Sequence, residues 1–367
     1  MYTVSNRMTF SFSRLRVVAP LLALALAGAG CFDTSTPATG PDGGVWKTSD
    51  KGVTWVNKKA FISAGPKLSA TGATFDVLEM TLDPQDRRAI YLATSANGLV
   101  YSLDGGDSWQ QAKIPGAVRV NSVTVDAKDK CVVYATSGNH IYKTDDCSRD
   151  WKEVFFGART DVSFTKIVAD WYNPTILYVG TSDGDIFRSS DSGVTWTKAI
   201  RADGVPITSL VLDPHDSRIV YAGTQGAGIL KTEDSGTTWT QVYKQFANDF
   251  TDARRILQVI PDPVEANLIY IVSKYGILKS PDKGETWTAL QLTTPPGSIK
   301  INSLAIDPKN NKNIVFTGVS TLQFTTDGGA SWSPKRLPTT QTGSTVLIDP
   351  IDSNTIYLGT TPPPQKN

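Results

Sequence analysis

The sequence is poor in the side chains that bind transition metals. Its 367 residues include only three cysteines and two histidines, His140 and His215, and none of these has the spacing of a metal site. The formal net charge is only +1, so no strong field favours nucleic acid or an acidic surface. We therefore expect no transition metal, no cofactor and no nucleic-acid partner. The aspartate-rich turns match no calcium loop of known type, and calcium binding stays open.

Signatures of common enzyme classes are also missing. The chain contains no phosphate-binding glycine loop, no Gly-x-Ser-x-Gly elbow and no His-Glu-x-x-His pair. A glycosidase needs two carboxylates that face one cleft. Glutamate is scarce, and most copies fall in turns described below: Glu79, Glu153, Glu233, Glu265 and Glu285. The sequence therefore carries no recognisable catalytic set.

What the chain does have is an eight-residue pattern that recurs along most of its length. Residues 189–196 show it as Ser/Thr, any residue, Asp, any residue, Gly, any residue, Ser/Thr, Trp. The Asp can accept hydrogen bonds from the turn, the Gly supplies a positive φ, and the Trp returns the chain to an apolar layer. We call each copy a box turn. The aspartates of the seven copies are Asp50, Asp104, Asp146, Asp191, Asp234, Asp282 and Asp327.

The spacing of the box turns predicts the architecture. The seven aspartates are 42 to 54 residues apart, close to the period of propeller blades. Each period also has a second hairpin pattern, as in residues 211–224, where alternating apolar residues lead to an Asp, usually a Pro, and a strand containing Tyr. We call its turn the Asp-Pro turn. Two hairpins in each period give four strands.

The two ends of the chain complement each other. The repeats begin with a box-turn hairpin at 44–56 and end with an Asp-Pro hairpin at 345–360. Every blade therefore has one hairpin of each kind only if these two hairpins lie in one sheet. The sequence therefore predicts an all-β, seven-bladed propeller of four-stranded antiparallel blades over residues 43–360, closed by its own termini. The proline-rich tail at 361–367 cannot extend the sheet.

The box turns resemble the Asp-box or BNR repeat, found in sialidases, sortilin-type receptors, xyloglucan-degrading hydrolases and photosystem II assembly factors. The resemblance covers residues 43–360, and it implies that the box is a structural turn remote from any binding site. Sialidases also carry an Arg-Ile-Pro motif that is absent here, and the xyloglucan hydrolases set two propellers around a cleft. We predict a monomeric binding or assembly platform for a protein or glycan, with a glycoside hydrolase as the alternative.

The N-terminal 31 residues have the pattern of a targeting segment. Three arginines precede an apolar stretch that is too short to span a bilayer, and small residues precede Cys31. This arrangement resembles a bacterial lipobox, which implies that Cys31 is acylated; the alternative is plain secretion. Residues 32–42 form a short linker. We expect a secreted, membrane-anchored lipoprotein that faces the periplasm or the cell surface.

The third box turn is irregular and contains a cysteine. It has Ser148 in place of Gly and Asp150 in place of the hydroxyl residue, and Cys147 lies within it. If the hairpin turns near residues 138 and 139, Cys131 and Cys147 stand opposite each other. A disulfide would stabilise the protein by about 3 kcal/mol in the chain-entropy model, and two reduced core cysteines are the alternative.

The candidate binding residues lie on the face opposite the box turns, which we call the funnel face. Its longest connections are 57–76 and 243–255, and the second has the composition of a recognition loop. The alternative is that its aromatic side chains pack on their own blade. If the protein is a glycosidase, Asp249 and Asp252 are the candidate catalytic residues. The candidate ligand-binding residues are Phe246, Asn248, Asp249, Phe250, Asp252, Arg254, Arg255, Arg119 and Arg159.

Overall fold

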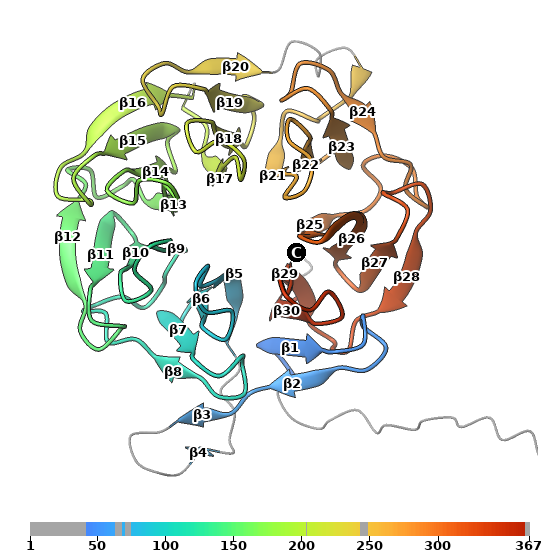
Figure 1. Cartoon of the computed structure of the whole chain (residues 1–367), viewed down its shortest axis with the longest axis horizontal. Helices are drawn as coiled ribbons and strands as arrows, with labels where there is room; N and C mark the ends of the chain where they lie inside the picture. The colour runs from blue at the N-terminus through green and yellow to red at the C-terminus, as the bar shows by residue number, and fades with distance from the viewer. Residues whose placement is uncertain (1–41, 63–67, 70–74, 203, 243–248, 364–367) are drawn as a thin grey trace, which may run out of the picture. The chain divides into compact units, whose positions relative to one another are not determined.

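Seven four-stranded antiparallel sheets are arranged in a ring in the computed structural model (Figure 1), which confirms the predicted fold. The structure describes residues 42–363 apart from 63–67, 70–74, 203 and 243–248. The predicted signal segment, Cys31 and most of the linker lie outside the described residues. Within them, no helix has the length and apolar character needed to cross a membrane.

Each blade runs from an innermost strand beside the central channel to an outermost strand at the rim (Figure 1). Blade 1 comprises β5 (Val77–Leu82), β6 (Ile90–Thr94), β7 (Leu99–Ser102) and β8 (Gln110–Gln111). Blade 2 comprises β9 (Ser122–Val125), β10 (Val133–Ser137), β11 (His140–Thr144) and β12 (Lys152–Phe156). Blade 3 comprises β13 (Phe164–Ala169), β14 (Leu177–Thr181), β15 (Asp185–Ser189) and β16 (Thr197–Arg201). Blade 4 comprises β17 (Ile207–Leu212), β18 (Val220–Thr224), β19 (Ile229–Thr232) and β20 (Thr240–Val242). Blade 5 comprises β21 (Ile256–Pro261), β22 (Ile269–Ser273), β23 (Ile277–Ser280) and β24 (Thr288–Ala289). Blade 6 comprises β25 (Ile301–Asp307), β26 (Asn310–Gly318), β27 (Thr321–Thr325) and β28 (Ser333–Arg336).

Blade 7 closes the ring with strands from both ends of the chain. It comprises β29 (Thr342–Ile348), β30 (Ile356–Thr361), β1 (Val45–Thr48) and β2 (Val56–Lys58). β1 pairs with β30 in the register Val45↔Gly359 to Thr48↔Ile356, as the sequence predicts. β30 continues to Thr361, which pairs with Thr342, so the sheet extends one residue into the predicted tail.

The glycine of the second strand allows neighbouring blades to approach closely. A Cβ atom on Gly223 in blade 4 would lie 2.6 Å from the side chain of Ile256 in blade 5, and one on Gly180 would lie 2.6 Å from Ile207. Real Cβ atoms do not make such contacts, because the interior is already close-packed. The glycine in the recurring strand pattern therefore marks the place where the next innermost strand presses against the blade.

Hydrogen bonds from side chains join the innermost strands of neighbouring blades. In five of the seven interfaces, a hydroxyl or amide at the fifth residue before the Asp of the Asp-Pro turn donates to a backbone carbonyl of the next blade. Thr208 donates to Ile256 O at 2.7 Å, for example, and Asn302 donates to Gly343 O at 2.7 Å. The other three donors are Asn121, Thr165 and Ser344. Separate sheets are thus connected where no backbone ladder joins them.

The box turns satisfy their own hydrogen bonds. In the copy at 189–196, the Asp191 carboxylate accepts from the Thr195 amide at 2.8 Å, and the Ser189 hydroxyl accepts from the Gly193 amide at 2.9 Å. Gly193 has φ +86°, as the turn requires. Burial of the box tryptophans is uneven, which the sequence did not indicate. Trp109 is fully buried, whereas Trp196 is half-buried.

The box aspartates predict a sensitivity to acid. Hydrogen bonds from Thr195 and Ser189 lower the pKa of Asp191 to about 2 from an ordinary value of 3.8, and the pKa values of the other six box aspartates are also lowered. A depressed folded-state pKa stabilises the fold above the unfolded value, and the contribution is lost as pH falls through the folded value. The urea concentration at the unfolding midpoint of the wild type should therefore decrease as the pH is lowered from about 4 to about 2.

The Asp191→Asn variant should show a smaller fall of the urea midpoint over the same window, because it lacks one of these titrating groups. Asp249→Asn, at an exposed aspartate outside the box turns, is the control and should follow the wild-type curve. Equal slopes for the wild type and Asp191→Asn below pH 4 would contradict the prediction.

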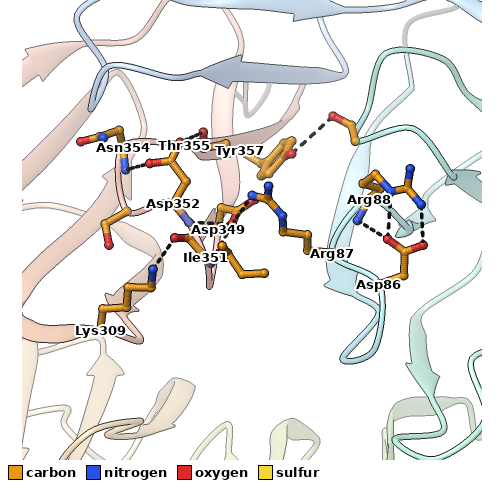
Figure 2. A network of polar contacts seen from close by, with 12 residues as sticks. Asp86, Arg87, Arg88, Lys309, Asp349, Ile351, Asp352, Asn354, Thr355 and Tyr357 are labelled. Carbon is orange, nitrogen blue, oxygen red and sulfur yellow. Dashed lines mark hydrogen bonds and ion pairs between the residues drawn. The ribbon is translucent and has the colours of Figure 1, made fainter.

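The Asp-Pro turns contact one another in a closed circle around one end of the channel. The Arg87 guanidinium of blade 1 donates to both carboxylate oxygens of Asp349 in blade 7 at 3.0 Å, and the Lys309 ammonium of blade 6 donates to Ile351 O (Figure 2). The remaining contacts are Gln85 with Asp126, Lys128 with the ring of Tyr172, Trp171 with Asp213, His215 with Asp262, and Asn311 with Glu265. Every blade is therefore linked to both neighbours on this face.

Cys131 and Cys147 form a disulfide in the structure. The β10–β11 hairpin pairs Ser137 with His140 and Val133 with Thr144, so a continued ladder would place Cys131 opposite residue 146 rather than 147. The third box turn corrects this offset, because Cys147 adopts φ 60° and donates its amide to Cys131 O at 3.3 Å.

The described residues 58–62 of the connection from blade 7 to blade 1 lie beside the outer edge of blade 1. β3 (Phe61–Ile62) pairs with β4 (Leu68–Ser69) outside the ring (Figure 1). Trp109 donates its amide to Ala60 O at 2.8 Å, and its indole NH donates to Lys58 O at 2.8 Å. We call residues 58–62 the strap, because they fasten blade 7 to the rim of blade 1.

Candidate functional site

The channel is lined by the innermost strands and encloses a cavity of about 660 Å³. A ring of polar residues surrounds it, one from each blade, at the fourth residue before the Asp of the Asp-Pro turn. In five of the seven, the side chain accepts a backbone N–H of the next blade, as Ser209 does from Val259 at 3.0 Å. The ring consists of Glu79, Ser122, Lys166, Ser209, Gln258, Ser303 and Thr345.

Two members of this polar ring form an ion pair. Glu79 of blade 1 accepts from the Lys166 ammonium of blade 3 and from the Ser122 hydroxyl of blade 2 at 2.8 Å. The two charged side chains are 20% and 27% exposed. An ammonium group cannot accept a hydrogen bond, so Lys166 cannot accept a backbone N–H of the next blade as Ser209 does. It donates to Glu79 of blade 1 instead.

A groove of about 520 Å³ lies beside this pair at the funnel-face end of the channel. Its lining includes Arg119 and Asn121 from the connection into blade 2, Gly138 from the β10–β11 turn, and Lys166. Arg119 is exposed and donates to the Asn121 side chain at 2.8 Å. Among the described residues, Arg119 has no acidic partner within ion-pair distance. The groove therefore presents a guanidinium group, hydroxyl groups and backbone groups, but few apolar side chains.

Arg159, another of the four predicted ligand-binding arginines, is paired with acidic residues in the structure. Arg159 pairs with Asp161 at 2.7 Å and with Asp183 at 2.6 Å, and Arg201 shares Asp183 at 3.2 Å. The hydrogen bonds and charge of Arg159 lower the pKa of Asp161. Because acids already occupy its guanidinium, Arg159 is less suited than Arg119 to bind an anionic ligand.

The connection 243–255, predicted as a recognition loop, only partly presents its side chains for binding. Phe250 packs against Tyr275 with ring centroids 5.2 Å apart and joins the core shared by blades 4 and 5, so this aromatic side chain follows the alternative of packing on the propeller itself. Asp249, Arg254 and Arg255 are exposed. Phe246 and Asn248 lie outside the described residues.

The candidate catalytic Asp252 is an ion-paired surface residue. Its carboxylate contacts the Lys274 ammonium at 2.6 Å, and this hydrogen bond lowers its pKa. A general acid of a glycosidase needs a raised pKa, so Asp252 is unsuited to that role. In the described lining of the channel and groove, Glu79 is the one carboxylate.

Sequence reasoning missed Glu79, Lys166 and Asn121 as site residues. Their positions in the repeat could have identified them. Each lies on an innermost strand, or just before it, at a position where most other blades have a small polar residue. Lining up the repeats on the Asp of the Asp-Pro turn finds Glu79 and Lys166 as the two charged members of one ring.

Comparison with known proteins supports this architecture. Residues 33–212 match the sequence family described as photosynthesis system II assembly factor YCF48. The protein is a seven-bladed β-propeller, and its first half is similar to this BNR-repeat family. A structure of YCF48 bound to D1 peptide superimposes with TM-score 0.61 and 17% identity, over 80% of this chain and 94% of that chain. YCF48 from Cyanidioschyzon merolae gives TM-score 0.60 and 13% identity, over 78% and 96%.

Xyloglucanases share part of this propeller. The sequence is 27% identical over 198 residues to a xyloglucanase from a Paenibacillus species, covering 44% of this chain and 19% of the enzyme. The Niastella koreensis GH74 enzyme superimposes with TM-score 0.63 and 17% identity, over 78% of this chain and 53% of that one. The propeller thus spans about a fifth of the xyloglucanase from Paenibacillus and about half of the solved GH74 chain.

Proposed function

We propose that this propeller is an envelope-anchored assembly or binding factor that holds a segment of a protein partner at the groove on the funnel face. The observation that carries the proposal is the exposed Arg119 guanidinium, which has no acidic partner among the described residues and lies in a 520 Å³ groove beside the channel. A guanidinium group and hydroxyl groups suit an acidic or polar peptide. The membrane anchor is inferred from the sequence around Cys31.

Two observations support a peptide over a glycoside substrate. The YCF48 structure that holds a peptide has nearly the same extent as this chain, whereas the xyloglucanases are several times longer than the matched region. Among the described residues that line the groove and channel, Glu79 is the one carboxylate, and it is paired with the Lys166 ammonium. A second carboxylate at the separation that glycosidases use is absent from that lining.

Site-specific photo-crosslinking in the native envelope tests the proposal. A photoreactive residue at Asn121 should capture one defined protein, and the same residue at Val194, an exposed box-turn position, should not. Arg119→Ala should reduce this capture by at least about tenfold, because a charge-assisted hydrogen bond contributes about 1.5–3 kcal/mol. Arg159→Ala is the matched control and should reduce it less.

Equal capture from both positions, or capture unchanged by Arg119→Ala, would reject the groove as the binding site. Hydrolysis of xyloglucan by the purified protein, lost on Asp249→Asn or Asp252→Asn, would establish the glycosidase alternative instead.

A further inference from the structure

Six of the seven blades bury a tyrosine at the same place on their second strand, and blade 6 does not. In blade 4, Tyr221 of β18 pairs with Val211 of β17; in blade 6 the matching pair is Val315 of β26 with Ala305 of β25. Val315 therefore stands where every other blade has a tyrosine. The tyrosines are Tyr91, Tyr134, Tyr178, Tyr221, Tyr270 and Tyr357, all at most 2% exposed.

The tyrosine ring lies beneath the box turn of the next blade. Tyr134 of blade 2 donates its hydroxyl to Ser192 O in the blade 3 box turn at 3.1 Å, and Tyr357 of blade 7 donates to Gly105 O in the blade 1 box turn at 3.3 Å (Figure 2). A Cβ atom on Gly193 would lie 3.4 Å from the Tyr134 ring. In these two interfaces the ring fills the space beneath the box turn, and a turn carbonyl accepts a hydrogen bond from its hydroxyl.

Blade 6 has a cavity at this interface. The space measures about 240 Å³ and lies between blade 6 and blade 7, next to the first box turn. Its apolar lining includes Ile314, Val315, Phe324 and Ile356, and the rest of its lining is polar, including Lys51 of the box turn and Asp307. The cavity has a simple origin, because valine is far smaller than the tyrosine of the other six interfaces.

Phe324 and Lys335 replace part of the missing tyrosine. Phe324 immediately precedes the blade 6 box turn, and a Cβ atom on Gly52 would lie 3.0 Å from its ring. The Lys335 ammonium lies 4.7 Å from the Phe324 centroid and donates to Lys51 O at 2.7 Å. Blade 1 has aromatic residues at both positions, with the stacked Tyr91 and Tyr101 rings 6.0 Å apart, so the fold has room for a second ring beside the first.

We propose that this cavity is a binding site for one phenol ring. Its 240 Å³ volume exceeds the roughly 150 Å³ of a cavity that holds benzene and is below the roughly 300 Å³ at which drug-sized pockets begin. The Lys51 carbonyl occupies the place of the Ser192 and Gly105 carbonyls that accept tyrosine hydroxyls elsewhere. A carbonyl oxygen has two lone pairs, so Lys51 O can accept from a phenol in addition to Lys335.

Methyl NMR of the full-length protein with p-cresol, the side-chain analogue of tyrosine, tests the proposal. Millimolar p-cresol should shift the methyl signals of Ile314 and Ile356 saturably and leave that of Ile90, at an interface filled by tyrosine, unchanged. Toluene should bind several-fold more weakly, because it cannot donate to Lys51 O. N-acetyl-tyrosinamide distinguishes the two possible ligands. If this compound also binds, the ligand is a tyrosine side chain of a peptide; if it does not bind, the ligand is a free phenol.

Val315→Tyr should abolish the p-cresol shifts and raise the melting temperature, because it supplies the missing ring covalently. Val319→Tyr, at a position 41% exposed on the β26–β27 turn, is the matched control and should leave binding intact. Tyr134→Val should create a second site, at which p-cresol restores part of the lost melting temperature. Absence of saturable shifts in the wild type, or shifts that survive Val315→Tyr, would overturn the proposal.

Discussion

Replacing Trp109 with alanine should lower the free energy of unfolding by about 3–5 kcal/mol, the usual cost of removing a large aromatic side chain from a core. Trp109 is fully buried and packs against Phe75 with ring centroids 6.0 Å apart. Its indole NH also holds Lys58 O at 2.8 Å. The substitution therefore removes core packing from blade 1 and the side-chain anchor of the strap at once.

Urea denaturation monitored by circular dichroism measures this effect. Trp332→Ala is the matched control, because Trp332 occupies the same box-turn position in blade 6 but is half-buried. We expect a clearly smaller loss for Trp332→Ala. Losses of equal size would show that burial and the strap do not set the role of Trp109.

Asp349→Ala should lower the free energy of unfolding by about 2–4 kcal/mol and weaken the closure of the ring. The Asp349 carboxylate is 3% exposed and accepts from the amides of Ile351 at 2.8 Å and Asp352 at 3.0 Å, as well as from Arg87 (Figure 2). Each amide that loses its buried acceptor costs about 1–3 kcal/mol. The ion pair adds little, because Arg87 is 41% exposed.

Two further variants separate the turn from the ion pair. Asp349→Asn keeps an acceptor oxygen for the turn and should cost about 1 kcal/mol, the value of the lost pair. Asp213→Ala removes the same turn in blade 4, where the carboxylate accepts from His215 and Asp216 and no described cation pairs with it. A negligible effect of Asp349→Ala in urea denaturation, with a full effect of Asp213→Ala, would contradict our account of the closing blade.

The fold was predictable because its signals are local and repeated. A box turn such as 189–196 contains its own hydrogen-bond donors and acceptors, and seven copies at a steady spacing leave few architectures to consider. The closure of the ring by the two ends of the chain followed from the equal numbers of box-turn and Asp-Pro hairpins. The contacts between blades were not predictable in the same way: Thr208 donates to Ile256, 48 residues away, and no local pattern encodes which residues meet across that interface.

The candidate site was harder to predict than the fold. Phe250 and the charged residues near it have the composition of a recognition loop, but composition does not separate an aromatic side chain that contacts a ligand from one that packs on Tyr275. Glu79 and Lys166 were hidden for a different reason. Each looks like an ordinary charged residue on a strand, and only the ring geometry brings blades 1 and 3 together. Alignment of the repeats shows valine at 315 in place of tyrosine, but it does not show the cavity between blades 6 and 7 that accompanies it.

The pairing of β1 with β30 also determines when the ring can form during synthesis. Val45 is made early, and its partner Gly359 is made more than three hundred residues later, so β1 lacks a partner on one side until almost the whole chain has emerged. An unpaired strand edge of this kind is a site of aggregation. A partly synthesised chain is therefore an open arc of blades, and a chaperone that covers residues 45–48 would protect it until the last strands are made.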